Sequence, residues 1–114
     1  MNQTQTPPFA ATAISEGTDL RLRLRGELDQ AAAQFVSLVE VVEGACTDDH
    51  TALVTDVGEL HYCDSSGIRA LLEAAEYCAR RGLTVRTVGA RGIVRRVFEI
   101  TAVIDALGVE NDTR

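Results

Sequence analysis

The residues best suited to chemistry lie between His61 and Gly67, where the chain reads HYCDSSG. A serine hydroxyl can accept a phosphoryl group or act as a nucleophile, and the carboxylate of Asp64 can accept hydrogen bonds from backbone amides. An apolar stripe at helical spacing begins at Ile68, so the segment stands at a helix start, where Asp and Ser commonly cap unpaired amides. Capping by itself explains one such side chain.

Two features of this segment exceed what capping requires. A second serine beside a cap is redundant, and Gly67 in the first turn gives up about 1 kcal/mol of helix propensity relative to Ala. A glycine beside an exposed hydroxyl leaves room for a partner backbone or a nucleotide phosphate, and a helix N-terminus favours an added phosphate. We therefore interpret Asp64, Ser65, Ser66 and Gly67 as a binding or modification site.

An enzymatic role for the serines finds little support. His61 lies in the same short segment as Ser66, and the chain has no G-x-S-x-G elbow. We expect both His50 and His61 at the surface. The chain contains no lysine, which excludes Schiff-base and P-loop chemistry and a phosphoaccepting-aspartate site built on Asp56. We expect a protein that is not an enzyme.

The composition also limits the kinds of ligand and partner that we expect the protein to bind. The net charge of −6 opposes nucleic acid, and 4% aromatic residues indicate no cofactor. The odd number of cysteines, without a C-x-x-C pair, argues against a disulfide framework and against a zinc site. No leader pattern and no apolar run of ~18 residues is present, so we expect a cytoplasmic protein without membrane insertion.

Strand and helix patterns alternate along the chain, which predicts a partly parallel sheet. Leu20, Leu22 and Leu24 alternate with arginines, so they should form one buried face of a hairpin whose other face is solvated. We expect strands over 9–15, 20–25, 52–57 and 84–88, and helices over 68–79, 93–100 and 104–107.

A further helix is predicted between the hairpin and the third strand. Ala32, Phe35, Leu38, Val39 and Val42 recur at helical spacing as one apolar face, until Gly44 ends the pattern.

The predicted fold is a single α/β domain over residues 9–110, with a mixed sheet of four to five strands and about four helices packed on it. Residues 1–8 and 111–114 are expected to be tails, the first of them flexible.

Three segments resemble a known family. Ala52–Leu72, ALVTDVGELHYCDSSGIRALL, resembles the signature of the STAS domain as it occurs in bacterial anti-sigma factor antagonists: a buried strand, D-S-S-G, then a helix with an apolar stripe. Arg25–Asp29, RGELD, is similar to the family's G-E-L-D turn, and Val97–Leu107, VFEITAVIDAL, to its C-terminal segment. The resemblance runs from about Phe9 to Val109.

This resemblance implies a phosphoprotein that regulates transcription. In the family, an anti-sigma factor that is itself a serine kinase phosphorylates a serine of the D-S-S-G loop, and Ser66 is the matching residue. The unphosphorylated antagonist binds the anti-sigma factor and frees the sigma factor, and a serine phosphatase would restore that state. Asp29 and Asp64 would lie near the acceptor hydroxyl, with Ser65 and Gly67 completing the partner-binding loop.

One position departs from the family pattern. Where the C-terminal segment usually reads T-G followed by an aliphatic residue, this chain has Thr101, Ala102 and Val103, so the bend there is expected to differ. STAS domains also serve in transporters, stress-signalling assemblies and lipid-transport complexes. The alternative function is therefore a nucleotide- or small-molecule-sensing subunit of a larger regulatory or transport assembly.

Overall fold

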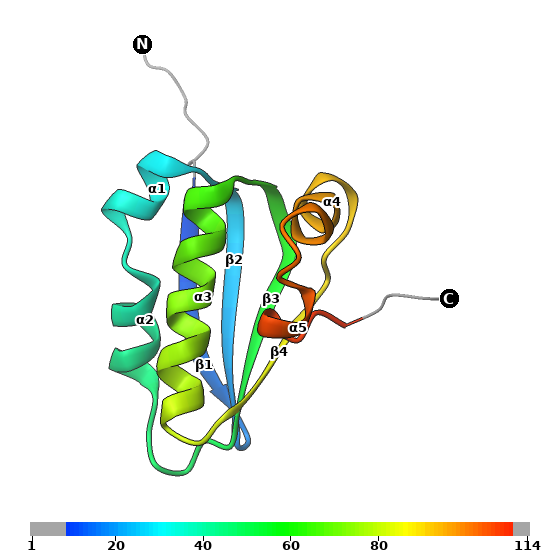
Figure 1. Cartoon of the computed structure of the whole chain (residues 1–114). Helices are drawn as coiled ribbons and strands as arrows, with labels where there is room; N and C mark the ends of the chain where they lie inside the picture. Colours follow the sequence, from blue (N-terminus) through cyan, green and yellow to red (C-terminus); the bar gives the residue numbers. More distant parts are fainter. Residues whose placement is uncertain (1–8, 111–114) are drawn as a thin grey trace.

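Four strands form one mixed sheet with the order β1-β2-β3-β4 (Figure 1). The first two are antiparallel, while β3 runs parallel to β2 and β4 runs parallel to β3. The computed structural model describes residues 9–110, so the predicted tails lie outside the described residues. The elements are β1 (Phe9–Glu16), β2 (Asp19–Leu28), α1 (Gln30–Phe35), α2 (Leu38–Ala45), β3 (Ala52–Cys63), α3 (Ser65–Arg80), β4 (Thr84–Val88), α4 (Gly92–Ile100) and α5 (Ile104–Leu107).

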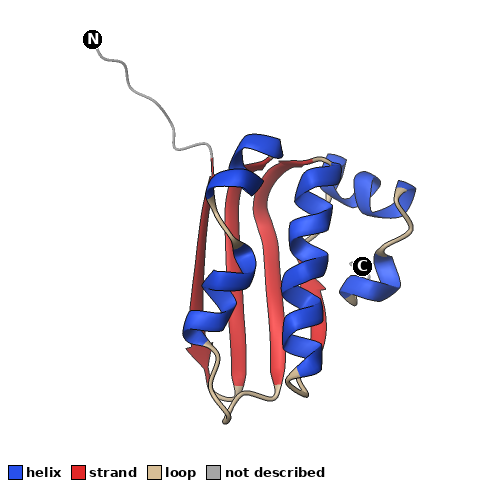
Figure 2. Cartoon of the chain, turned by 60° about the vertical axis from the view of Figure 1, so that its left-hand side comes forward, coloured by secondary structure: helices blue, strands red, loops and turns tan. Residues whose placement is uncertain are grey.

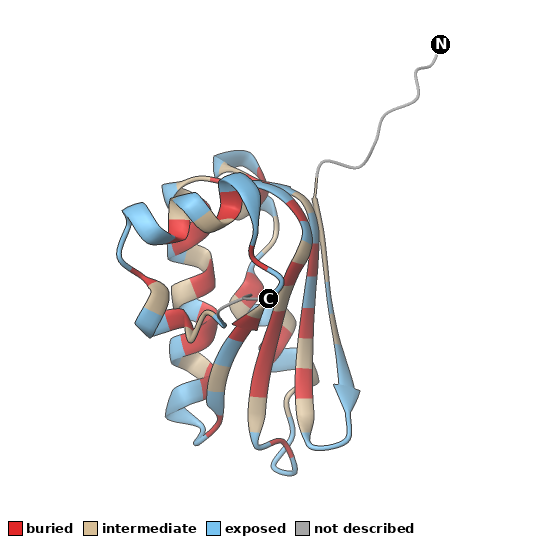
Figure 3. Cartoon of the chain, turned by 90° about the vertical axis from the view of Figure 1, so that its right-hand side faces the viewer, coloured by how far each residue is buried: buried red, intermediate tan, exposed pale blue. Residues whose placement is uncertain are grey.

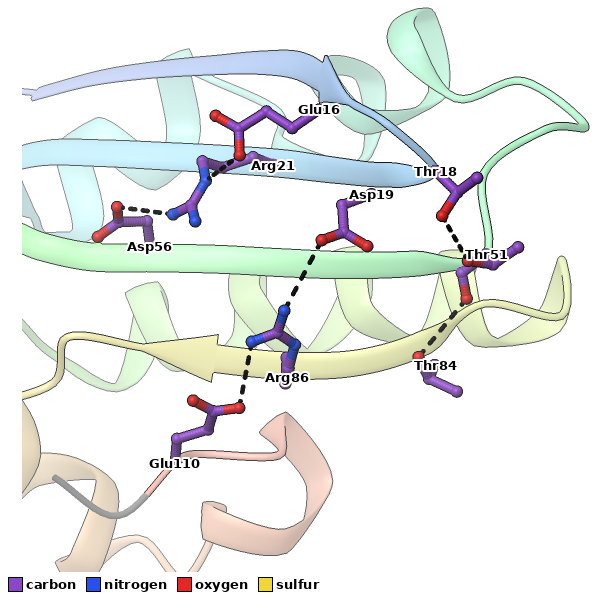
Figure 4. Close-up of polar contacts among 9 residues, drawn as sticks. All are labelled: Glu16, Thr18, Asp19, Arg21, Thr51, Asp56, Thr84, Arg86 and Glu110. Atoms are coloured by element: carbon purple, nitrogen blue, oxygen red, sulfur yellow. Dashed lines mark hydrogen bonds and ion pairs between the residues drawn. The ribbon is translucent and has the colours of Figure 1, made fainter. Parts of the chain in front are cut away.

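The two faces of the sheet differ as the alternating sequence of β2 predicts. Leu20, Leu22 and Leu24 are fully buried, and the helices lie on their side of the sheet (Figures 2 and 3). Arg21, between Leu20 and Leu22, forms ion pairs with Glu16 at the end of β1 at 3.0 Å and with Asp56 of β3 at 2.9 Å (Figure 4). In β4, Arg86 pairs with Asp19 at the start of β2 at 3.7 Å and with Glu110 at 3.2 Å (Figure 4). The α/β architecture with a mixed sheet is confirmed.

The prediction of one continuous helix over 32–42 is wrong, because the chain forms two helices there. The hydroxyl of Ser37 accepts a hydrogen bond from the amide of Glu40 at 3.2 Å and caps α2, and Val36 before it is extended. A residue suited to capping therefore overrides a continuous apolar pattern. The break turns the side chain of Phe35 outward, to 86% exposure, instead of into the predicted apolar face. The described part of the chain accordingly has five helices.

Strand β3 is longer than the prediction of 52–57. It continues to Cys63 because it stays paired with β2 as far as Leu28, with register shifts that absorb the irregularity around Gly26. His61, Tyr62 and Cys63 are therefore strand residues, and Asp64 alone separates β3 from α3.

The expectation of a surface position is wrong for His50, which is 6% exposed. Its Nδ1 accepts a hydrogen bond from the amide of Thr47 at 2.9 Å, and its Nε2 lies 2.8 Å from the hydroxyl of Ser15. These bonds fasten the loop between α2 and β3 to β1. The buried His50 therefore stabilises the fold. It precedes β3, whereas Ser65 and Ser66 follow the other end of that strand.

The bend after α4, where we expected a departure from the family, is a left-handed turn at Ala102, with φ of 59°. The amide of Ala102 donates to the carbonyl of Glu99, and that of Val103 to the carbonyl of Phe98, both at 3.3 Å. This is the hydrogen-bond pattern of a Schellman motif, in which glycine usually occupies the left-handed position.

We predict that Ala102→Gly stabilises the domain by about 1 kcal/mol, because a side chain with a Cβ is strained in this conformation. Thermal unfolding would show the midpoint rising by roughly 5 °C. Ala70→Gly, in the interior of α3, is the control and should lower stability by about 1 kcal/mol. A decrease for both variants would contradict the strain at Ala102.

Candidate functional site

Asp29 and Asp64 meet at the carboxyl edge of the sheet. They directly follow Leu28 and Cys63, the last residues of β2 and β3, which are partners in the parallel register. The amide of Asp64 also reaches the carbonyl of Leu28, at 3.4 Å. Two helices thus begin side by side at the edge where parallel sheets commonly place their functional residues.

Both aspartates cap the helices that they precede. A carboxylate oxygen of Asp29 accepts from the amide of Ala32 at 2.9 Å. One carboxylate oxygen of Asp64 accepts from the amides of Ser66 at 3.0 Å and Gly67 at 3.1 Å. Two of the amides at the start of α3 are therefore engaged by the protein itself, and the capping prediction from sequence holds for Asp64.

The two serines differ in their surroundings. Ser65 is exposed, whereas Ser66 is partly buried and lines a shallow groove of about 190 Å³ between α1 and α3. Within residues 9–110 the Ser66 hydroxyl has no hydrogen-bond partner, so it is available for chemistry or for a partner. The groove is lined by Gln30, Ala33, Gln34, Ser66, Arg69, Ala70 and Glu73.

The close approach expected at Gly67 occurs within the chain. Gly67 is buried, and a Cβ added there would lie 2.5 Å from the carbonyl oxygen of Leu28 and 2.8 Å from the sulfur of Cys63. Glycine is thus required for α3 to pack against the end of β2. This packing positions Ser66. It also explains why residue 67 is a glycine, with no need to invoke a partner molecule.

Arg69 is a site residue that the sequence reasoning did not single out. It lies one turn after Ser66 and lines the same groove. The spacing of three residues on one helix is the signal that could have identified it, since such residues share a face. Arg69 and Glu73 together bring one positive and one negative charge to the groove lined by the serine.

The three cysteines are free thiols, and their environments differ. Burial, followed by the charge of Asp64, raises the pKa of Cys63 to about 12. Burial also raises the pKa of Cys78 to about 11. Cys46 is partly exposed. Cys63 stands before a helix start, but its burial and raised pKa both lower the fraction of reactive thiolate.

We predict that one thiol, that of Cys46, reacts quickly with a chromogenic thiol reagent at pH 8, and that Cys46→Ser removes the fast phase. Equal reactivity of all three thiols would contradict this assignment.

The raised pKa values of Cys63 and Cys78 mean that the folded state holds these protons more tightly than the unfolded state. The contribution of these two thiols to stability is complete below pH 9 and is lost as the pH rises through about 11 and 12.

Between residues 9 and 110, no group of three or more His, Cys, Asp or Glu side chains is placed to hold a metal ion. No helix in that range is long and apolar enough to cross a bilayer.

The fold and the D-S-S-G helix start define a STAS-type domain. The family model described as "Mlab, STAS domain" matches residues 12–108, and the chain therefore belongs to the STAS domain family. No curated protein sequence matches the chain.

Solved structures share this fold. An anti-sigma factor antagonist from Mycobacterium paratuberculosis superposes with a TM-score of 0.74 at 20% identity, covering 93% of this chain and 89% of that chain. The Bacillus cell fate determinant SpoIIAA in its phosphorylated form gives a TM-score of 0.57 at 21% identity, covering 90% and 93%. The murine anion transporter Slc26a9 gives 0.69 at 14% identity, but there the domain corresponds to 21% of the transporter chain. At these low identities, the TM-scores establish a common fold alone.

Proposed function

We propose that this domain is an anti-sigma factor antagonist. Unphosphorylated, it binds an anti-sigma factor that is a serine kinase and so releases a sigma factor in the cytoplasm, and phosphorylation of Ser66 ends that complex. The observation that carries the proposal is the position of the Ser66 hydroxyl: without a hydrogen-bond partner among the described residues, beside a groove, at the edge where two capped helices begin. The likeness to anti-sigma factor antagonists supports it.

A phosphate on Ser66 would change the surface more than the fold. It adds about −1.5 to −2 charges. Because Asp64 already accepts from the amides of Ser66 and Gly67, the phosphate gains little from them, and in the groove lining the cation Arg69 is offset by Glu73. Across an interface, a like charge ~4 Å away costs about 4 kcal/mol at an effective dielectric near 20. Repulsion from the partner therefore dominates.

The experiment that tests this function is a comparison of partners recovered from native lysate with the wild-type chain and with Ser66→Asp. Mass spectrometry should identify a serine kinase of the anti-sigma type with wild type and not with the variant. Recovery of one non-kinase assembly with both chains would favour the alternative.

That alternative is a nucleotide- or small-molecule-sensing subunit of a larger assembly. The likeness to a domain that forms part of a transporter chain favours it. A rise in unfolding temperature with GTP or ATP, in the absence of any kinase, would support it because a ligand that binds the folded state stabilises that state.

A further inference from the structure

Phe35 is the large hydrophobic side chain most exposed to solvent among the described residues, at 86%. The next is Ile100 at the end of α4, at 75%. A single exposed hydrophobic residue is unremarkable, but an aromatic side chain is the type that most often anchors protein interfaces. Whether Phe35 belongs to an interface therefore depends on the residues around it.

The helix that carries Phe35 has no charged residue. The sequence from Gln30 to Ser37 reads QAAAQFVS, in a chain that is 25% charged. Depletion of charge together with an exposed aromatic residue is the composition of the central part of a protein interface.

The local structure also holds Phe35 in place. Asp29 caps the start of α1, and the chain turns extended at Val36 before Ser37 caps α2. If the two helices were one, Phe35 would join the buried stripe of α2. The break instead fixes the aromatic ring on the outside of a short helix that packs against α3.

The surface of α1 is continuous with the serine groove. Gln30, Ala33 and Gln34 form one wall of that groove, and Ser66 and Arg69 lie on the other. Figures 1 and 2 both show α1 beside the first turns of α3. A partner that fills this groove over the Ser66 hydroxyl contacts the wall formed by α1, and Phe35 lies at the end of that same helix, outside the groove lining.

We infer that Phe35 is the apolar anchor of the partner complex. The partner is a protein whose contact surface offers an apolar pocket to Phe35 and uncharged hydrogen-bonding groups to Gln30 and Gln34. This inference rests on the proposed function, because the partner is the anti-sigma factor that reads Ser66. Phosphorylation then acts at Ser66 on α3, which forms one wall of the groove. The anchor Phe35 lies on α1, the helix that forms the other wall.

The test compares Phe35→Ala with Ile100→Ala, a matched change on α4. Binding of each purified variant to the purified anti-sigma factor is measured by calorimetry. We expect Phe35→Ala to weaken binding at least tenfold and Ile100→Ala by less than threefold. Both variants should unfold within a few degrees of wild type, since both side chains are largely exposed. Binding of Phe35→Ala within threefold of wild type would overturn the inference.

A second measurement reports burial directly. The chain has no tryptophan, so Phe35→Trp and Ile100→Trp each introduce the chain's single tryptophan, which is excited selectively over its two tyrosines. On addition of the anti-sigma factor, the emission of the first should move to shorter wavelength and that of the second should not, whereas an unchanged Phe35→Trp spectrum in a formed complex overturns the inference.

The same titrations separate the two hypotheses. If wild type binds, Ser66→Asp does not, and Phe35→Ala binds normally, the anchor is wrong and the proposed function stands. If wild type does not bind any anti-sigma factor, the proposed function is wrong and the anchor falls with it. Sedimentation that shows self-association through Phe35 would make the occupant a second copy and would also overturn the inference.

Discussion

Ser66→Asp is expected to weaken binding of the anti-sigma factor by about a hundredfold or more, which corresponds to roughly 2.7 kcal/mol. The added carboxylate would face the partner across the groove between α1 and α3, where desolvation and like-charge repulsion both oppose the complex. The fold should be nearly unaffected, because Ser66 is partly exposed and the introduced charge lies at a helix N-terminus.

Calorimetric binding and thermal unfolding, measured on the same preparation, check this prediction. Ser65→Asp is the matched control: it carries the same charge one residue away, on a side chain that is exposed outside the groove. It should weaken binding much less than Ser66→Asp. Equal losses for the two variants would show a general charge effect, and unfolding of Ser66→Asp would show that the serine is structural.

Gly67→Ala is expected to destabilise the domain by about 2 kcal/mol or more. The new methyl group would lie 2.5 Å from the backbone carbonyl oxygen of Leu28, and neither β2 nor α3 can yield without disturbing the core. This cost exceeds the roughly 1 kcal/mol that alanine gains in helix propensity. Denaturant unfolding measures the difference.

Gly44→Ala in α2 separates packing from propensity. No atom lies within 4 Å of the Cβ that alanine would add there, so this variant should be stabilised by up to about 1 kcal/mol. If Gly67→Ala were stabilised to a similar extent, the close contact with Leu28 would not hold α3 in place.

Local patterns in the sequence predict the sheet well. The alternation of leucine and arginine in β2 predicts both faces, since side chains on a strand point to alternate sides. The break between α1 and α2 was missed because Phe35 fits the helical spacing of the residues around it, and only the cap at Ser37 indicates otherwise.

The site was predictable in part. Asp64 as a cap follows from local sequence, but the expected end of the third strand at Val57 would leave six residues between the strand and Asp64. The convergence of Asp29 and Asp64 depends on parallel pairing that continues to Cys63, which a pattern confined to one strand does not contain. Arg69 likewise becomes a groove residue only when α1 is packed against α3.

The most direct test of the phosphorylation switch is to map the phosphate. The purified anti-sigma factor and ATP are incubated with wild type and with Ser66→Ala, in which Ser65 is intact, and the modified residue is identified by mass spectrometry. The account predicts phosphate on Ser66 alone, none on the variant, and loss of partner binding by the phosphorylated chain. Phosphate on Ser65, or a phosphorylated chain that binds as tightly as the unmodified one, would contradict it.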